Sequence, residues 1–158
     1  MNIKIYCVGK VKDFYKLGVD EYVKRLGSYC KVQIVEVKDE SIPEKASEGE
    51  IKKAKDIECK RILDLIKKNE YLISLDLGQK EMDSEAFSGF LQEKLENNGA
   101  NISFVIGGSY GLSDELKSRA NSSISISKFT FPHQLARLVL LEQIYRAFKI
   151  LNNETYHK

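Results

Sequence analysis

The sequence predicts an α/β fold, with one domain over residues 1–158 and a largely parallel β-sheet covered by helices on both faces. Stretches typical of strands alternate along the whole chain with stretches of helical periodicity. Apolar and β-prone residues over Ile102–Ile106 lead directly into a loop with glycines at 107, 108 and 111, the pattern of a buried strand ending at a ligand site. No linker, repeat or low-complexity segment divides the 158 residues.

The first half of the chain is expected to contain three strands and two helices. Alternating β-branched residues predict the strands, and apolar residues at helical spacing predict the helices. In chain order they are a strand over Asn2–Val8, a helix capped by Asp13 and ending near Leu26, a strand over Lys31–Lys38, a helix over Glu50–Lys68 and a strand over Tyr71–Leu77. The polar segment Asp39–Gly49 contains Pro43 and is expected to be a surface loop or a mobile lid.

The second half continues the same alternation. A helix beginning at Ser84 should end at Asn97–Gly99, where residues that tolerate the left-handed conformation follow one another. The remaining expected elements are the strand over Ile102–Ile106, a short helix over Ser113–Ala120, a strand over Ser122–Ser127 and a helix from Pro132, at its first position, to about Leu151.

The last helix has an unusually wide apolar surface. At about 100° per residue, its apolar side chains fill roughly 200° of the circumference, about twice what one core-facing stripe needs. They are Leu138, Leu140, Leu141, Ile144, Tyr145, Ala147, Phe148 and Leu151. Two explanations remain open: the helix lies centrally within its own domain, or its extra face packs against a second copy in a C2 homodimer.

Composition excludes several classes of protein. No apolar run reaches the roughly 18 residues of a membrane span, and the N-terminal stretch lacks the features of a signal peptide, so a cytoplasmic protein without a membrane partner is expected. Cys7, Cys30 and Cys59 are too few and too widely spaced for a zinc site or a disulfide framework. We therefore expect no metal and three buried, inert thiols.

The net charge of +2 is low for a protein that holds nucleic acid through phosphate contacts alone. If the protein acts on RNA, shape or a larger assembly must supply much of the affinity.

Three predicted strands end in segments suited to a ligand. They are Leu75–Gly78, Gly107–Gly111 and Ile124–Gln134. Because the carboxyl ends of parallel strands meet at one edge of a sheet, these segments should line one pocket. Each alone also has a structural explanation: a tight glycine turn without a ligand, or Phe129 and Phe131 as core residues. The glycine segment matches neither a phosphate-binding P-loop nor a dinucleotide-binding motif.

Residues for acid–base chemistry are few. The sequence shows no carboxylate pair, nucleophile–base pair or set of metal ligands. His133 begins the last helix, where the helix dipole should lower its pKa, and a structural role is favoured for it. The C-terminal Tyr156, His157 and Lys158 offer stacking, hydrogen bonding and charge, which suit an RNA base and its phosphate.

Several motifs together closely resemble one family. FVIGGSYGLS, SISKFTFPHQLAR, LEQIYRAFKI and the terminal YHK, with KIYCVGKVKDFY and EYVKRLGSY near the start, are similar to the bacterial methyltransferases H, which methylate N3 of a pseudouridine in large-subunit rRNA. This family is part of the SPOUT superfamily. The resemblance covers the whole chain, and the combination of motifs is highly specific.

The resemblance implies a fold, a cofactor and partners. It implies a deep C-terminal trefoil knot over about residues 102–151 and a homodimer. It implies S-adenosylmethionine as the cofactor and a stem-loop of 23S rRNA, methylated on the assembled ribosome, as the substrate. By position, the cofactor-binding residues are Leu75, Gly107, Ile126, Ser127, Lys128, Phe129, Thr130 and Phe131.

For the chemistry we expect direct transfer of the methyl group, with the protein supplying orientation and a dry pocket. Tyr156 and His157, reaching across the dimer, are the candidate catalytic residues, with His157 as a base for the N3 proton. Arg137 is a candidate to steer a phosphate or the base, and His133 is a weaker candidate. The alternatives are a nucleotide-binding α/β enzyme and a non-enzymatic ribosome-binding factor.

Overall fold

A computed structural model describes residues 1–158 and contains one five-stranded sheet in which all strands are parallel, in the order β2-β1-β4-β3-β5. The strands are β1 (Asn2–Val8), β2 (Lys31–Val37), β3 (Leu72–Glu81), β4 (Asn101–Ile106) and β5 (Ser122–Ser125). The helices are α1 (Asp13–Leu26), α2 (Glu48–Leu63), α3 (Ser84–Asn97), α4 (Asp114–Arg119) and α5 (His133–Leu151). The predicted α/β alternation and parallel sheet are therefore confirmed.

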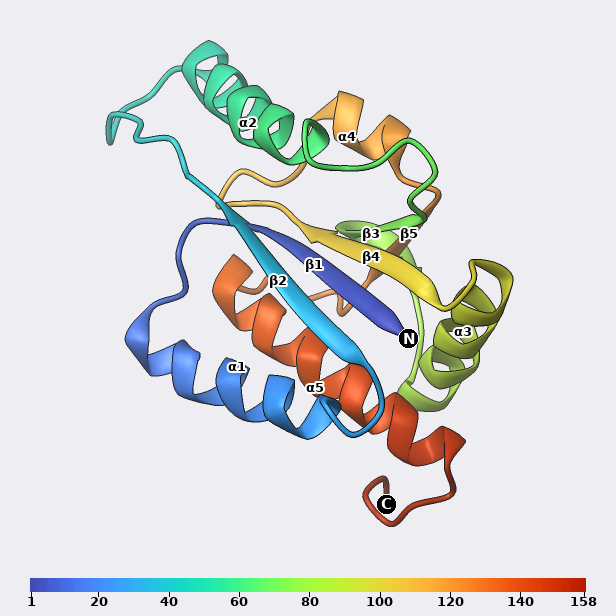
Figure 1. The fold of residues 1–158 in the computed structure, drawn as a ribbon. Coiled ribbons are helices and arrows are strands. Elements are labelled where there is room, and N and C mark those ends of the chain that lie inside the picture. Colours follow the sequence, from blue (N-terminus) through green and yellow to red (C-terminus); the bar gives the residue numbers. More distant parts are fainter.

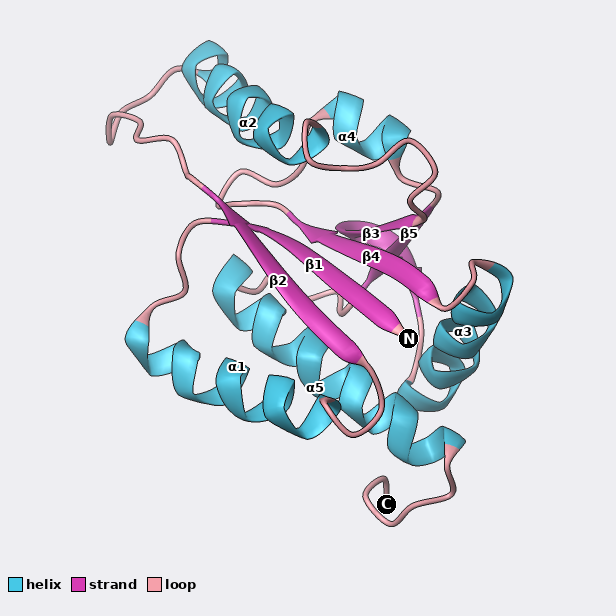
Figure 2. Ribbon diagram, in the orientation of Figure 1, coloured by secondary structure: helices cyan, strands magenta, loops and turns pink.

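The helices form a layer on each face of the sheet, as predicted. α2 and α4 cover one face, and α1, α3 and α5 cover the other (Figures 1 and 2). Ile5 and Phe104 point into the larger core below the sheet, whereas their chain neighbours Tyr6 and Val105 point into the smaller core beneath α2 and α4. Because successive side chains of a strand point to opposite faces, the two central strands must be apolar on both sides.

The wide apolar surface of α5 has an explanation within this chain. The helix lies between α1 and α3 beneath the sheet (Figure 1), and every one of its residues is buried or partly buried. Gly18 of α1 lets the two helices approach closely, since a Cβ there would lie 2.9 Å from a methyl carbon of Leu138. Central packing therefore uses most of the apolar surface that the periodicity singled out.

The predicted cap of α1 is wrong. Asp13 is the first helical residue, and Lys12 occupies the N-cap without a side-chain cap. The side chain of Gln134 closes this end instead, accepting from the Lys12 amide at 2.7 Å and donating to the Lys10 carbonyl at 3.2 Å. Similarly, Pro132 is the N-cap of α5 rather than its first residue.

Three further boundaries differ from the prediction. α2 ends at Leu63 rather than Lys68. In the segment that then leads to β3, Glu70 accepts a hydrogen bond from the Tyr6 hydroxyl at 2.8 Å. β5 ends at Ser125 rather than Ser127. β3 continues to Glu81 through a bulge, so that Ile124 pairs with both Leu75 and Lys80.

All three thiols are free and buried, as predicted. Burial raises the pKa of the Cys7 thiol to about 12 and that of Cys30 to about 11, which leaves both protonated and unreactive at neutral pH. No helix combines the length and hydrophobicity that crossing a bilayer requires. The trefoil knot implied by the family resemblance stays a prediction.

The packing of the larger core can be tested at Leu91 of α3, whose side chain is 0% exposed. Leu91→Ala should lower the free energy of unfolding by about 2–5 kcal/mol, because it removes buried apolar contacts and leaves a cavity. Leu65→Ala is the matched control, since Leu65 is 50% exposed and should change stability by less than about 1 kcal/mol. Urea titration followed by circular dichroism measures both, and equal losses would contradict the core assignment.

Candidate active site

The predicted pocket exists at the carboxyl edge of the sheet. It has a volume of about 620 Å³, within the range of small-molecule sites. Segments following β3, β4 and β5 line it together with the start of α5. The lining residues are Leu75–Leu77, Ile106–Ser109, Gly111, Ser125–Ser127, Phe129–His133 and Ala136.

The glycine loop after β4 has no room for a side chain at its first position. A Cβ on Gly107 would lie 2.5 Å from the carbonyl carbon of Gly111, and one on Gly108 would lie 3.0 Å from Oε1 of Glu58. The loop closes on itself through a hydrogen bond from the Gly111 amide to the Gly108 carbonyl at 3.1 Å. Gly111 also has a φ of +82°, which favours glycine. The loop therefore presents bare backbone to the pocket.

The β3 wall is shaped by the bulge. Pairing with β5 is interrupted between Leu75 and Lys80, and Gly78 takes a φ of +76° within the interruption. This leaves Leu75, Asp76 and Leu77 along the pocket. Asp76 is paired with Lys117 of α4 at 3.3 Å, so the carboxylate is held at the pocket wall.

The segment after β5 contributes most of the third wall. Ile126, Ser127, Phe129, Thr130 and Phe131 all line the pocket. Lys128 does not line the pocket, and its side chain is exposed to solvent. The structure thus brings together seven of the eight residues that the resemblance implied for cofactor binding. Phe129 is itself 79% exposed, so it forms an open side of the pocket.

Arg137 does not occupy the position expected of a residue that steers phosphate. Its side chain is 1% exposed and does not line the pocket; it donates to Glu36 at 2.8 Å and to the Gly9 carbonyl at 3.0 Å. Glu36 also accepts from the Val11 amide at 2.7 Å. These contacts tie the start of α5 to the exits of β1 and β2, which gives Arg137 a structural role in this chain.

His133 lines the pocket near Arg137 and Asp39. Burial lowers the pKa of its imidazole, Arg137 lowers it further, and Asp39 opposes them. The direction is the expected one, but the main cause is burial rather than the helix dipole. The ring therefore stays neutral at the pocket wall at neutral pH.

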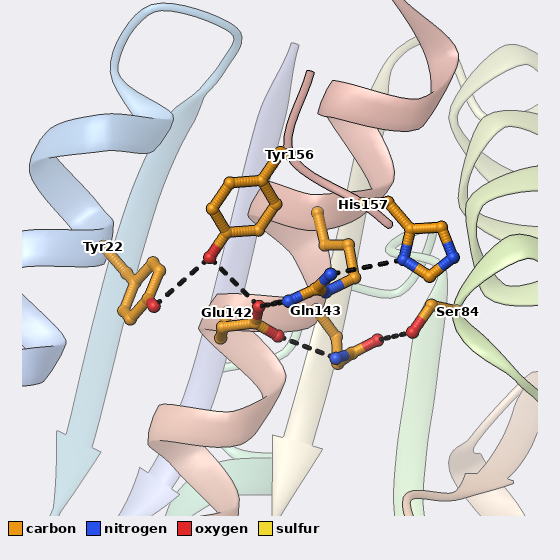
Figure 3. A network of polar contacts seen from close by, with 7 residues as sticks. Tyr22, Ser84, Glu142, Gln143, Tyr156 and His157 are labelled. Atoms are coloured by element: carbon orange, nitrogen blue, oxygen red, sulfur yellow. Dashed lines mark hydrogen bonds and ion pairs between the residues drawn. The ribbon is translucent and has the colours of Figure 1, made fainter. Parts of the chain in front are cut away.

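The C-terminal tail is not part of this pocket. After α5, Asn153 takes a φ of +54°, and hydrogen bonds from Asn153 to Ile150 and from Glu154 to Lys149 turn the chain back along the helix. Tyr156 and His157 then pack beside α5, as Figure 3 shows. His157 lines a neighbouring cavity of about 600 Å³, between α3 and α5.

The two cavities share a wall. Ser125, Ile126, Ser127 and Phe131 line both of them. Within one chain this wall separates the tail from the glycine loop. No group of three or more His, Cys, Asp or Glu side chains is placed to hold a metal ion.

Known proteins resemble this chain over nearly its whole length. A family described as "Predicted SPOUT methyltransferase" matches residues 1–157. The chain belongs to the SPOUT methyltransferase family. It is 53% identical to proteins named ribosomal RNA large subunit methyltransferase H from Clostridium botulinum and Lactobacillus johnsonii, over 100% of this chain and of each relative. A third such relative, from Clostridioides difficile, is 49% identical over the same coverage. The resemblance seen in the motifs is confirmed.

Two solved structures share the fold of this chain. The tRNA (m1G37) methyltransferase of Aquifex aeolicus aligns with 92% of this chain and 70% of its own, with a TM-score of 0.51 and 15% identity. A probable methylase family protein from Haemophilus influenzae aligns with 96% of this chain and 66% of its own, also with a TM-score of 0.51. At such low identity the likeness extends to the fold alone.

The placement of Arg137 yields a prediction that separates a structural role from a steering role. Arg137→Met should lower the free energy of unfolding by about 1–3 kcal/mol, because it removes the ion pair with Glu36 and leaves the Gly9 carbonyl without this donor. Arg25→Met is the control: its pair with Glu21 is exposed and screened by solvent, so its loss should leave stability almost unchanged. Thermal and urea unfolding measure both. Unchanged stability in Arg137→Met would restore the steering role.

Proposed function

We propose that this SPOUT family member transfers a methyl group from S-adenosylmethionine to N3 of a pseudouridine in a stem-loop of 23S rRNA, on the assembled ribosome. The observation that carries the proposal is the pocket where three strand exits meet around a glycine loop whose first position has no room for a side chain. Full-length relatives named as large-subunit rRNA methyltransferases support the substrate class. An enzyme with this substrate works in the cytoplasm.

The residues present fit the proposed cofactor. Leu75, Ile126 and Phe131 offer apolar and aromatic surfaces for the adenine ring, while the bare backbone around Gly107 allows close approach. Ser127 and Thr130 add hydroxyl groups along the same wall. When bound, the cofactor would supply an activated methyl group, and the protein would supply orientation and exclusion of water.

The charge of the protein agrees with a ribosomal substrate. A net charge of +2 gives little general attraction for naked RNA. Recognition of an rRNA stem-loop within a large particle instead relies on shape and on several contact surfaces.

We further propose a homodimer in which the tail of one protomer completes the pocket of the other. The wall between the tail and the pocket within one chain supports this arrangement. On α1, beside α5, Phe14 and Leu17 are 71% and 80% exposed, and they stand one helical turn apart. Two large apolar side chains exposed together are typical of a surface that a partner covers.

Binding of the methyl donor is tested with Gly107→Val. Titration calorimetry with S-adenosylmethionine should show binding to the wild type and none to the variant, because the added side chain collides with the Gly111 backbone. Gly89→Ala on α3 is the control, since a Cβ there meets nothing within 4 Å. Circular dichroism verifies that the Gly107 variant is folded. Tight binding of ATP or NAD by the wild type, without binding of S-adenosylmethionine, would favour the nucleotide-binding alternative.

The dimer surface is tested with Leu17→Asp. Sedimentation should show a dimer for the wild type and a monomer for the variant, because a charge would be buried without a partner at the interface. Leu65→Asp, at an exposed leucine after α2, should leave the dimer intact. A dimeric Leu17→Asp variant would place the interface elsewhere, and a monomeric wild type would refute the dimer.

A further inference from the structure

The tail is held in one orientation by a chain of contacts that begins on α5. Glu142 accepts from Nε and Nη2 of Arg146, one turn further along the helix, at 3.0 and 2.5 Å. The same Glu142 oxygen accepts from the Tyr156 hydroxyl at 3.1 Å, and the Arg146 guanidinium lies over the Tyr156 ring at 4.7 Å. Figure 3 shows Glu142 on α5 and Tyr156 on the returning tail pointing toward each other.

Tyr156 is fixed from several sides. Its ring packs edge-on against Tyr145 at 5.0 Å, and its hydroxyl lies 3.4 Å from that of Tyr22 on α1. Burial raises the pKa of the Tyr156 phenol, and the contacts with Tyr22 and Glu142 raise it further. Tyr156 is therefore a protonated anchor that fastens the tail to α5 and α1.

The third nitrogen of the Arg146 guanidinium, which does not contact Glu142, faces His157, the residue after Tyr156. Nη1 of Arg146 lies 3.2 Å from Nδ1 of the imidazole. A guanidinium can only donate hydrogen bonds, so Nδ1 must be the acceptor, without a proton. In a neutral imidazole the proton then lies on Nε2.

The opposite side of the ring agrees with this tautomer. Nε2 of His157 faces the carboxylate of Glu85 on α3, at 3.7 Å, a group that attracts an N–H. Because that separation exceeds hydrogen-bond length, the Nε2–H remains available to another acceptor. The charged groups that face the ring are thus Arg146 from α5 and Glu85 from α3.

We propose that Arg146 is a positioning residue that selects the Nε2–H tautomer of His157, so that His157 donates a hydrogen bond to the substrate rather than accepting its proton. The inference rests on the proposed function, and it replaces the expected role of His157 as a base. Suitable acceptors are the carbonyl oxygens beside N3 of the base, or a phosphate oxygen. When the N3–H bond breaks, its electron pair stays on nitrogen and the proton passes to a solvent water molecule.

The tautomer is tested directly by nitrogen NMR of the full-length protein with labelled histidine. Nδ1 of His157 should resonate as an unprotonated nitrogen and Nε2 as a protonated one. Arg146→Met should remove this preference. Lys149→Met is the control, since Lys149 holds Glu154 at 2.6 Å but does not contact His157. A protonated Nδ1 in the wild type, or equal effects of the two variants, would overturn the proposal.

Two amide substitutions test the donor role in methyl transfer. In His157→Gln the amide nitrogen can replace Nε2 as a donor, whereas His157→Asn reproduces the Nδ1 position and lacks the outer donor. We expect His157→Asn to lose about 10²-fold in rate, the usual cost of one missing donor to a reacting group, and His157→Gln to keep most of the rate. Equal large losses in both, with binding of the methyl donor intact, would contradict the donor role.

The proposed function and the proposed role of Arg146 can fail separately. A wild type that methylates no rRNA refutes the proposed function, whatever the NMR result. A wild type that methylates rRNA but carries its proton on Nδ1 of His157 refutes only the role of Arg146.

Discussion

All five strands of this protein run in the same direction, and the candidate site depends on that constraint. Because parallel strands share one carboxyl edge, the chain must leave β3, β4 and β5 side by side. None of the three exits forms a pocket alone. The glycine loop supplies bare backbone, the β3 bulge supplies Leu75, and the segment after β5 supplies aromatic side chains.

The segment after β5 also sets the relation between the pocket and the tail. It lines the cavity around the glycine loop on one side and the cavity that contains His157 on the other. The buried contacts of Arg137 and Gln134 fix the start of α5, while the turn at Asn153 sends the tail back along the same helix. α5 thus separates the candidate pocket at one end from the tail groups, and under the proposed function a second protomer is the simplest way to bring the two together.

Most of the fold could be predicted from the sequence, because periodicity and glycine positions report local structure directly. The strand over Asn2–Val8 and the left-handed turn at Gly99 are examples. The errors arise where distant residues decide. Gln134 closes the start of α1 from 122 positions away, and β5 draws β3 beyond Leu77 through a bulge. The burial of Arg137 follows from Glu36, about a hundred residues earlier, and no local pattern signals it.

The site could be predicted as a meeting of strand exits, but its boundaries needed the structure. Motif matching included Lys128, whose side chain is exposed, and it could not show that Arg146 contacts His157.

The central claim, that each reaction site combines the pocket of one chain with the tail of another, is tested most directly by mixing two inactive variants. Gly107→Val lacks a working pocket but keeps its tail, and a chain truncated after Thr155 keeps its pocket but lacks Tyr156 and His157. After subunit exchange, the mixed dimer contains one intact pocket facing one intact tail, so methylation of 23S rRNA should reappear although neither variant is active alone. Mixed dimers that form but stay inactive would contradict the account.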